Sequence, residues 1–211
     1  NVPGTWQLKG ELDVVVLHTA INQIIARHES LRTIFAMDDD GPVQIIMPTL
    51  DLALPVVDVT GQSNSQLQQR INALATQPFD LKTGPLIRVG LYRQAKDKHV
   101  LHIDMHHIIT DGWSMGVLFQ ELIQCYGAAL AKTAMPLPEL PIQYADYALW
   151  QREWLQGEVL DKQLVYWQQQ LAGEPALLSI PSDRPRPTEQ SFKGTFQSRV
   201  LSPSLSESLN T

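Results

Sequence analysis

The sequence predicts a mixed α/β fold, an α+β sandwich in which helices cover a mixed sheet. Segments with helical and with strand periodicity follow one another in the order α, β, β, α, β, β, α, α, β, which is typical of such layered folds. The composition agrees, because 44% of the 211 residues are hydrophobic and supply enough apolar side chains for a sizeable core. No internal repeat or low-complexity segment interrupts the pattern.

The first third of the chain predicts one helix followed by two strands. Asp13 fits the N-cap of the helix, and the apolar side chains behind it recur at helical spacing. This stripe consists of Leu17, Ala20, Ile21, Ile24 and Ile25. Residues 31–36 and 43–47 predict strands, joined by a hairpin turn over the acidic residues 38–40 and Gly41. A metal site at these acidic residues is the weaker alternative, because adjacent carboxylates point in different directions.

The middle of the chain predicts a helix, two more strands and a longer helix. Ser63 and Gln66 have the spacing of a capping box at the start of the first of these helices. Residues 87–91 alternate as a strand, and after a polar turn the strand 99–105 returns. The second helix covers residues 115–130, with Asp111 or Ser114 near its N-cap. The apolar stripes of the two helices are Leu67, Ile71 and Leu74, and then Leu118, Leu122, Cys125 and Tyr126.

The last third predicts helices between proline-rich segments. Residues 142–174 contain no proline and predict one or two helices, followed by an extended connector over 182–187 and a strand over 196–201. Ser202-Pro203 has the signal of a helix start, and that helix would be unfinished at the end of the chain. Because the chain also begins without methionine, we expect it to be a piece of a longer protein.

Charge and composition argue against two classes of partner. The net charge is −6, and the basic residues form no run longer than the Lys96/Lys98 pair, so we expect no nucleic-acid binding. No stretch of about 18 apolar residues exists, and the first ten residues lack the pattern of a signal peptide, so we expect no membrane association. The single cysteine, Cys125, fits a reducing compartment, which favours a cytoplasmic protein.

Four of the six histidines fall within nine residues, at His99, His102, His106 and His107. The last two lie where the predicted strand ends, in a loop that leads to the helix after Asp111. Backbone N–H groups and the positive end of a helix dipole are expected beside them. The loop is therefore the strongest candidate for chemistry in the chain.

Three interpretations of this cluster are open. The histidines can be structural groups at a strand end, or His102, Asp104 and His106 can converge on a zinc ion from alternating strand positions. The zinc interpretation has little support, because no His-Glu-x-x-His string and no cysteine partner accompany them, so we expect no metal. The third is general acid–base catalysis, for which imidazole is suited because it titrates near neutrality.

Residues 106–112, with the sequence HHIITDG, resemble the His-His-x-x-x-Asp-Gly signature of the condensation domains of nonribosomal peptide synthetases. Further strings similar to that family's motifs follow the expected order. They are RHESLRTIF at 27–35, PFDL at 78–81 with GPL at 84–86 and Arg88, YADYALW at 144–150, and PSDRPRP at 181–187. Together these strings cover nearly the whole chain.

The resemblance implies a chloramphenicol-acetyltransferase-like lobe, the N-terminal one of a two-lobed fold. The family's first motif is expected upstream of Asn1 and its later motifs beyond Thr211, and neither is present. We therefore expect residues 1–181 to be the N-terminal lobe, truncated at its start. Residues 182–211 would be the connector and the truncated start of the C-terminal lobe.

The resemblance also implies the reaction and its partners. The family forms a peptide bond when an acceptor α-amine attacks a donor thioester, with both substrates held on the 4′-phosphopantetheine arms of carrier domains. No cofactor is expected to bind the chain directly. The expected partners are the donor and acceptor carrier domains, an adjacent adenylation domain and the missing C-terminal lobe. The IITDGWS form of residues 108–114 resembles the subtype that accepts an L-configured donor.

By the same resemblance, His107 is the main catalytic candidate, either as a base for the attacking amine or as a group that orients it. His106 is expected to pack back into the strand end. Asp111 resembles a buried carboxylate of the family that pairs with an arginine, for which Arg32 is the expected partner. Gly112 is expected to let the backbone approach the substrate, with its N–H as a candidate oxyanion donor.

Trp113 and Ser114 are candidates for lining the substrate tunnel, although packing against the core or the second lobe is an equal alternative for Trp113.

Two other functions stay open. One is a different HHxxxDG acyltransferase, which transfers an acyl group to an alcohol or amine; the strings RHESLRTIF and YADYALW argue against it. The other is a non-catalytic module that recruits carriers or tailoring enzymes, against which the intact His106 and His107 argue.

Overall fold

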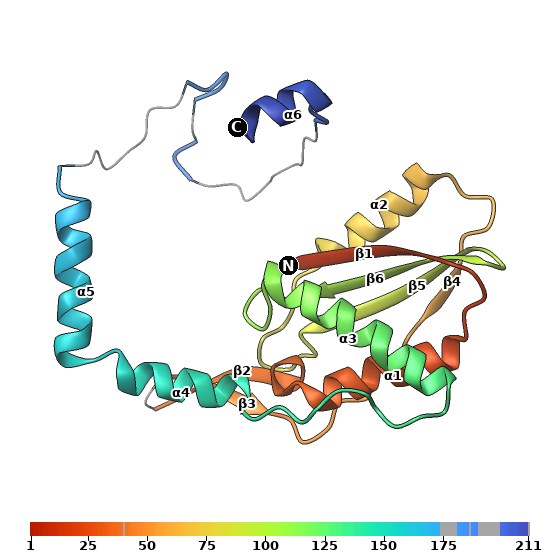
Figure 1. Cartoon of the computed structure of the whole chain (residues 1–211), viewed down its shortest axis with the longest axis horizontal. Coiled ribbons are helices and arrows are strands. Elements are labelled where there is room, and N and C mark those ends of the chain that lie inside the picture. The colour runs from red at the N-terminus through yellow and green to blue at the C-terminus, as the bar shows by residue number, and fades with distance from the viewer. Residues whose placement is uncertain (40, 174–180, 186, 190–198, 211) are drawn as a thin grey trace. The chain divides into compact units, whose positions relative to one another are not determined.

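The computed structural model describes residues 1–39, 41–173, 181–185, 187–189 and 199–210 (Figure 1). Contacts divide the chain into two units, Asn1–Asp161 and Lys162–Thr211. The first unit contains the sheet, its covering helices and all of the histidines, so it is the unit that positions the candidate site.

A four-stranded mixed sheet forms the centre of the first unit. Its strands, in spatial order, are β1 (Val2–Lys9), β6 (Lys98–Met105), β5 (Ile87–Ala95) and β4 (Val56–Asp58). The first three are antiparallel neighbours, whereas β4 runs parallel to β5. A separate hairpin pairs β2 (Thr33–Asp38) with β3 (Gly41–Ile46). The mixed sheet confirms the predicted fold class.

Helices cover both faces of this sheet (Figure 1). One face packs against α1 (Val14–Arg27) and α3 (Gly112–Leu130), and the other against α2 (Asn64–Ala75). The assignment of faces follows from the alternation along β6, where Leu101 belongs to the first cluster and its neighbour Val100 to the second. The unit is thus a three-layer sandwich of helix, sheet and helix.

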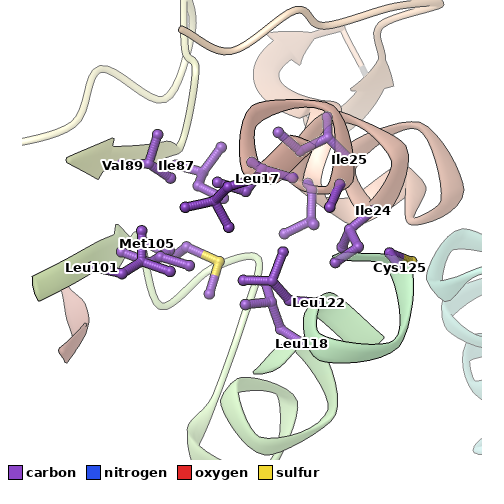
Figure 2. Close-up of a cluster of buried hydrophobic side chains, with 14 of the residues drawn as sticks. Leu17, Ile24, Ile25, Ile87, Val89, Leu101, Met105, Leu118, Leu122 and Cys125 are labelled. Atoms are coloured by element: carbon purple, nitrogen blue, oxygen red, sulfur yellow. The ribbon is translucent and has the colours of Figure 1, made fainter. Parts of the chain in front are cut away.

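The main core lies between α1, α3 and the sheet. Figure 2 shows Leu17, Ile24 and Ile25 of α1 in one cluster with Leu118 and Leu122 of α3. All five residues of the predicted α1 stripe are buried, which confirms that prediction. Side chains from β5 and β6 close the cluster from the sheet side, namely Ile87, Val89, Leu91, Leu101, Ile103 and Met105.

Side-chain caps begin all three sandwich helices, two at the predicted position and the third, α3, three residues before the predicted residue 115. The Asp13 carboxylate accepts hydrogen bonds from two N–H groups of the first turn of α1. Ser63 and Gln66 form the predicted capping box of α2. Asp111, one of the two caps considered for the third helix, is the N-cap of α3. The loop before α3 therefore ends at a defined residue.

Three predictions about elements were wrong or incomplete. The strands β1 and β4 were not predicted, and a short 3-10 helix, η1 (Glu29–Arg32), delays the start of β2 to Thr33. Residues 199–201 are not in a strand, and the remainder of the strand predicted over 196–201 lies outside the described residues.

The proline-free segment forms two helices, α4 (Tyr144–Trp154) and α5 (Gly157–Gln170), and a short α6 (Pro203–Leu209) follows Ser202 as predicted. No helix in the part of the chain that the structure describes is long and apolar enough to cross a membrane.

Candidate active site

The loop 106–111 joins the end of β6 to the start of α3 and carries the histidine pair. Two backbone hydrogen bonds hold its beginning. The His106 N–H donates to the carbonyl oxygen of Leu86 at 3.0 Å, and the Ile109 N–H donates to the carbonyl oxygen of His106 at 3.1 Å. The loop is therefore tied to the segment that precedes β5 and folds back on itself before α3 begins.

The ring of His106 is fixed in one tautomer. Its Nδ1 accepts a hydrogen bond from the backbone N–H of Ile108 at 3.0 Å. Because a backbone N–H can only donate, Nδ1 carries no proton and the neutral ring is protonated on Nε2. Burial lowers the pKa of His106, which favours this neutral form. An edge-to-face contact with the Phe79 ring, at 6.1 Å between centroids, completes its packing at the strand end.

His107 is exposed and opens onto a cleft of about 320 Å³. The cleft is formed by the histidine loop, the first turn of α3, the start of α4 and the segment that runs from η1 into the β2–β3 hairpin. Its lining residues are Ser30, Thr33, Phe35, Gln44, His107, Ile108, Ile109, Thr110, Asp111, Ser114 and Tyr144. Three of the motif strings that lie far apart in the sequence therefore meet around one imidazole.

Some lining residues were not singled out by sequence reasoning. Ser30 and Thr33 lie inside the RHESLRTIF string, so their motif was the available signal, although no role was assigned to them individually. Gln44 lies on β3 outside the motif strings, and no pattern in the sequence distinguishes it. It reaches the cleft only because β3 pairs with β2, where Gln44 lies opposite Phe35.

The structure does not form the expected pair between Arg32 and Asp111. Asp111 is exposed, and its Oδ1 accepts hydrogen bonds from the N–H and the hydroxyl of Ser114 at 2.8 and 2.6 Å. These bonds lower the pKa of Asp111. Arg32 instead donates to the carbonyl oxygen of Met47 at 2.5 Å and lies 3.4 Å from Glu29 Oε1. The physical reason is that the Asp111 carboxylate caps α3, because the unpaired N–H groups of the first turn of this helix lie within three residues of it.

Gly112 is the first residue of α3 and is exposed. Its N–H belongs to the first turn, which has no carbonyl four residues earlier in the helix to accept from it. A Cβ placed on Gly112 would meet no described atom within 4 Å, so the backbone is open to an approaching group. The expected approach of a substrate to this backbone stays a prediction.

Trp113 is 85% exposed, so it is not a core residue of the first unit. It lines a second depression of about 160 Å³, to which His28 and Val117 also contribute. Ser114 lines both this depression and the larger cleft. The two tunnel candidates therefore lie at the surface beside the histidine loop, and Ser114 marks the boundary between the two hollows.

The zinc interpretation finds no support in the geometry. Within the described ranges, no three His, Cys, Asp or Glu side chains lie close enough to hold a metal ion. His102 is buried, with its Nδ1 3.1 Å from the carbonyl oxygen of Gly4, and burial lowers its pKa. His106 directs its Nδ1 to the backbone N–H of Ile108. His102 thus belongs to the interior of the sheet, and His106 to the packing at the strand end.

Comparison with known proteins identifies relatives of the whole chain. The family model named Condensation domain matches residues 1–211. The linear gramicidin synthase of Brevibacillus parabrevis contains a polypeptide that is 46% identical over 209 residues, which cover 97% of this chain and 3% of that polypeptide. Gramicidin S synthase 2 of Aneurinibacillus migulanus is 43% identical over 194 residues, which cover 92% of this chain and 4% of that synthase.

Solved structures give a similar result. The X-domain in its complex with OxyB from teicoplanin biosynthesis is 34% identical with a TM-score of 0.79, over 88% of this chain and 41% of that one. The SgcC5 protein from Streptomyces globisporus is 29% identical with a TM-score of 0.71, over 82% and 40%. The chain thus spans a small part of each synthase and about two fifths of each solved chain.

Proposed function

The chain belongs to the condensation-domain family of nonribosomal peptide synthetases and has its chloramphenicol-acetyltransferase-like fold, and from this membership we propose that it supplies the histidine-bearing half of an amide-forming active site. In the proposed reaction, the α-amine of an acceptor attacks the carbonyl carbon of a donor thioester. The C–N bond forms, the C–S bond breaks, and the proton lost by the amine ends on the departing thiolate. Both substrates arrive on the 4′-phosphopantetheine arms of carrier domains.

The observation that carries this proposal is the position of His107, exposed in the cleft at the start of α3. A neutral imidazole at this place can accept the proton of the attacking amine or orient its lone pair. The developing oxyanion would lie near the N-terminus of α3, where the Gly112 N–H and the helix dipole favour negative charge. The base thus lies in the loop 106–111, and the oxyanion donor is the first residue of the helix that follows it.

The neighbouring residues have supporting parts in this proposal. His106 holds the loop through its bond to the Ile108 N–H. Asp111 holds the start of α3 as its N-cap. Trp113 and Ser114 would line the path of a phosphopantetheine arm, which fits their place along the second depression.

The proposed active unit is larger than this chain. Residues 1–181 would form the N-terminal lobe, and residues 182–211 would lead into the C-terminal lobe that completes the tunnel. The coverage of about two fifths of the solved relatives supports this division. The partners would be two carrier domains and an adenylation domain of a cytoplasmic synthetase. The IITDGWS string supports an L-configured donor.

An alcohol acceptor is the second candidate, because the related SgcC5 protein was crystallised with an aryl ethanediol. In this reaction the hydroxyl oxygen attacks the same thioester carbon, the C–O bond of an ester forms, the C–S bond breaks, and the hydroxyl proton ends on the departing thiolate. His107 would have the same part, and it would matter more because a hydroxyl group is a weaker nucleophile than a neutral amine.

The test is product formation by the full protein with two loaded carrier domains. His107→Ala should lower the rate by about 10²-fold or more, as expected when a general base is removed. Its melting temperature should not change, since the side chain is exposed. His18→Gln, on α1 outside the cleft, is the control and should keep the wild-type rate. Unchanged product formation by His107→Ala would overturn the proposal. If the wild-type protein forms an ester with an added alcohol but no amide, the second candidate is selected.

A further inference from the structure

Asp104 has a fully buried carboxylate two residues before the histidine pair. Its Oδ2 accepts a hydrogen bond from the side-chain amide of Asn1 at 3.1 Å and lies 3.7 Å from Nη1 of Arg88. Its Oδ1 has no hydrogen-bond partner among the residues that the structure describes. A buried carboxylate is costly unless it is paired, so the contact with Arg88 is the feature that makes this position tolerable.

Arg88 holds the segment that follows α2 to the sheet. It is the cross-strand register partner of Asp104, so both side chains project from the same face. Its guanidinium donates to the carbonyl oxygens of Gln77 and Pro78, at 3.0 and 2.5 Å. The same group lies 3.6 Å from the centre of the Phe79 ring. One planar cation therefore contacts the carboxylate, two carbonyls and an aromatic face together.

Phe79 continues this set of contacts to the histidine loop. Its ring meets the ring of His106 edge to face, with the centroids 6.1 Å apart and the planes at 84°. The His106 ring in turn accepts the hydrogen bond from the Ile108 N–H that spans His107. Contacts thus run without interruption from Asp104 through Arg88 and Phe79 to the backbone on both sides of His107.

We propose that Arg88 and Phe79 are positioning residues, which hold the ring of His106 and thereby set the orientation in which the loop presents His107. This inference rests on the proposed function, since it assumes that His107 acts on the substrate. Arg88, Phe79 and Asp104 do not line either hollow beside the loop, so they act only through His106. A lysine cannot replace Arg88 fully, because an ammonium lacks the planar fork that satisfies two carbonyls and stacks on a ring.

The kinetic test compares variants of the full protein in the condensation assay. Phe79→Leu keeps the apolar contact but loses the ring edge, and Arg88→Lys keeps the charge but loses the fork. Each should lower kcat by about tenfold to a hundredfold, because misplacing a reacting group by about 1 Å has effects of this size. The KM for the loaded carriers should stay within about twofold, since neither side chain lies in the cleft. Phe79→Tyr retains the aromatic ring and should therefore keep kcat near the wild-type value, unlike Phe79→Leu.

Arg93 provides the matched control. It lies on the same strand as Arg88 and also pairs with its register partner, Asp58, at 2.9 Å, but this pair is exposed. Arg93→Lys therefore removes the same fork without touching the histidine loop and should keep the wild-type kcat. An equal loss of kcat in Arg93→Lys and Arg88→Lys would overturn the positioning role, and so would wild-type kcat in both Phe79→Leu and Arg88→Lys.

A readout that does not depend on activity separates this inference from the proposed function. A crystal structure of Phe79→Leu should show the His106 ring rotated away from the Ile108 N–H. An unchanged His106 ring in that structure would overturn the positioning role even if His107→Ala proves inactive. An active His107→Ala would overturn the proposed function, whatever the ring of His106 does.

Discussion

Burial of Asp104 should make the protein less stable as the pH rises from about 4 to about 6. Burial raises the pKa of Asp104 from 3.8 to about 6, and the nearby Arg88 guanidinium offsets only part of this effect. Between these pH values the folded protein still binds a proton that the unfolded chain has released, so the free energy of unfolding falls as the pH rises. At about 1.4 kcal/mol per pKa unit, the whole effect is about 3 kcal/mol, of which about 2 kcal/mol is lost between pH 4 and pH 6.

The perturbation that isolates this effect is Asp104→Asn, because the amide has nearly the same shape and does not titrate. The free energy of unfolding is measured by urea denaturation of both proteins between pH 4 and pH 7.5. The advantage of the wild type over Asp104→Asn should shrink by about 2 kcal/mol across this range. Parallel pH profiles for the two proteins would refute the reasoning, since they would show that Asp104 titrates alike in the folded and unfolded states.

Asp58→Asn is the control with the opposite sign. The backbone hydrogen bond from Thr60 is the largest of the effects that lower the pKa of Asp58 to about 2. A lowered pKa adds stability above the unfolded value of 3.8, and this stability is lost only as the pH falls toward 2. Between pH 4 and pH 7.5 the wild type and Asp58→Asn should therefore show nearly parallel profiles, unlike the pair at Asp104.

Substitutions at three further positions test the site and its support. Asp111→Ala should lower both the melting temperature and the rate of condensation. Asp111→Asn can still cap α3 and should melt like the wild type. Equal losses of melting temperature in the two variants would instead support an ion pair between Asp111 and Arg32. Gln143→Ala removes two hydrogen bonds that hold the start of α4 to the end of α1 and to η1, and urea denaturation should show a loss of about 1–3 kcal/mol. Leu122→Ala opens a cavity between α1 and α3 and should cost about 2–5 kcal/mol in the same assay, and a loss below about 1 kcal/mol would contradict the close packing of these two helices.

Features that depend on residues close together in the sequence could be predicted. The stripe of α1, the capping box of α2 and the cap of α3 each involve side chains within one or a few helical turns, so their spacing is sufficient. The strand β1 was missed because Pro3 and Gly4 have low strand propensity, and only pairing with β6 across most of the chain stabilises it. The strand β4 is three residues long and pairs in parallel, which leaves little pattern to detect.

The sequence by itself determined the family and the loop that carries His107, because five motif strings in a fixed order identify both without knowledge of any contact. Only the tertiary structure decided the partners of the charged side chains. Asp111 meets the N–H groups of its own helix instead of Arg32, and Asp104 meets Arg88. The physical reason is that several cations and N–H groups compete for each carboxylate. Strand register and helix start, which bring the winning partner close, are properties of the folded chain.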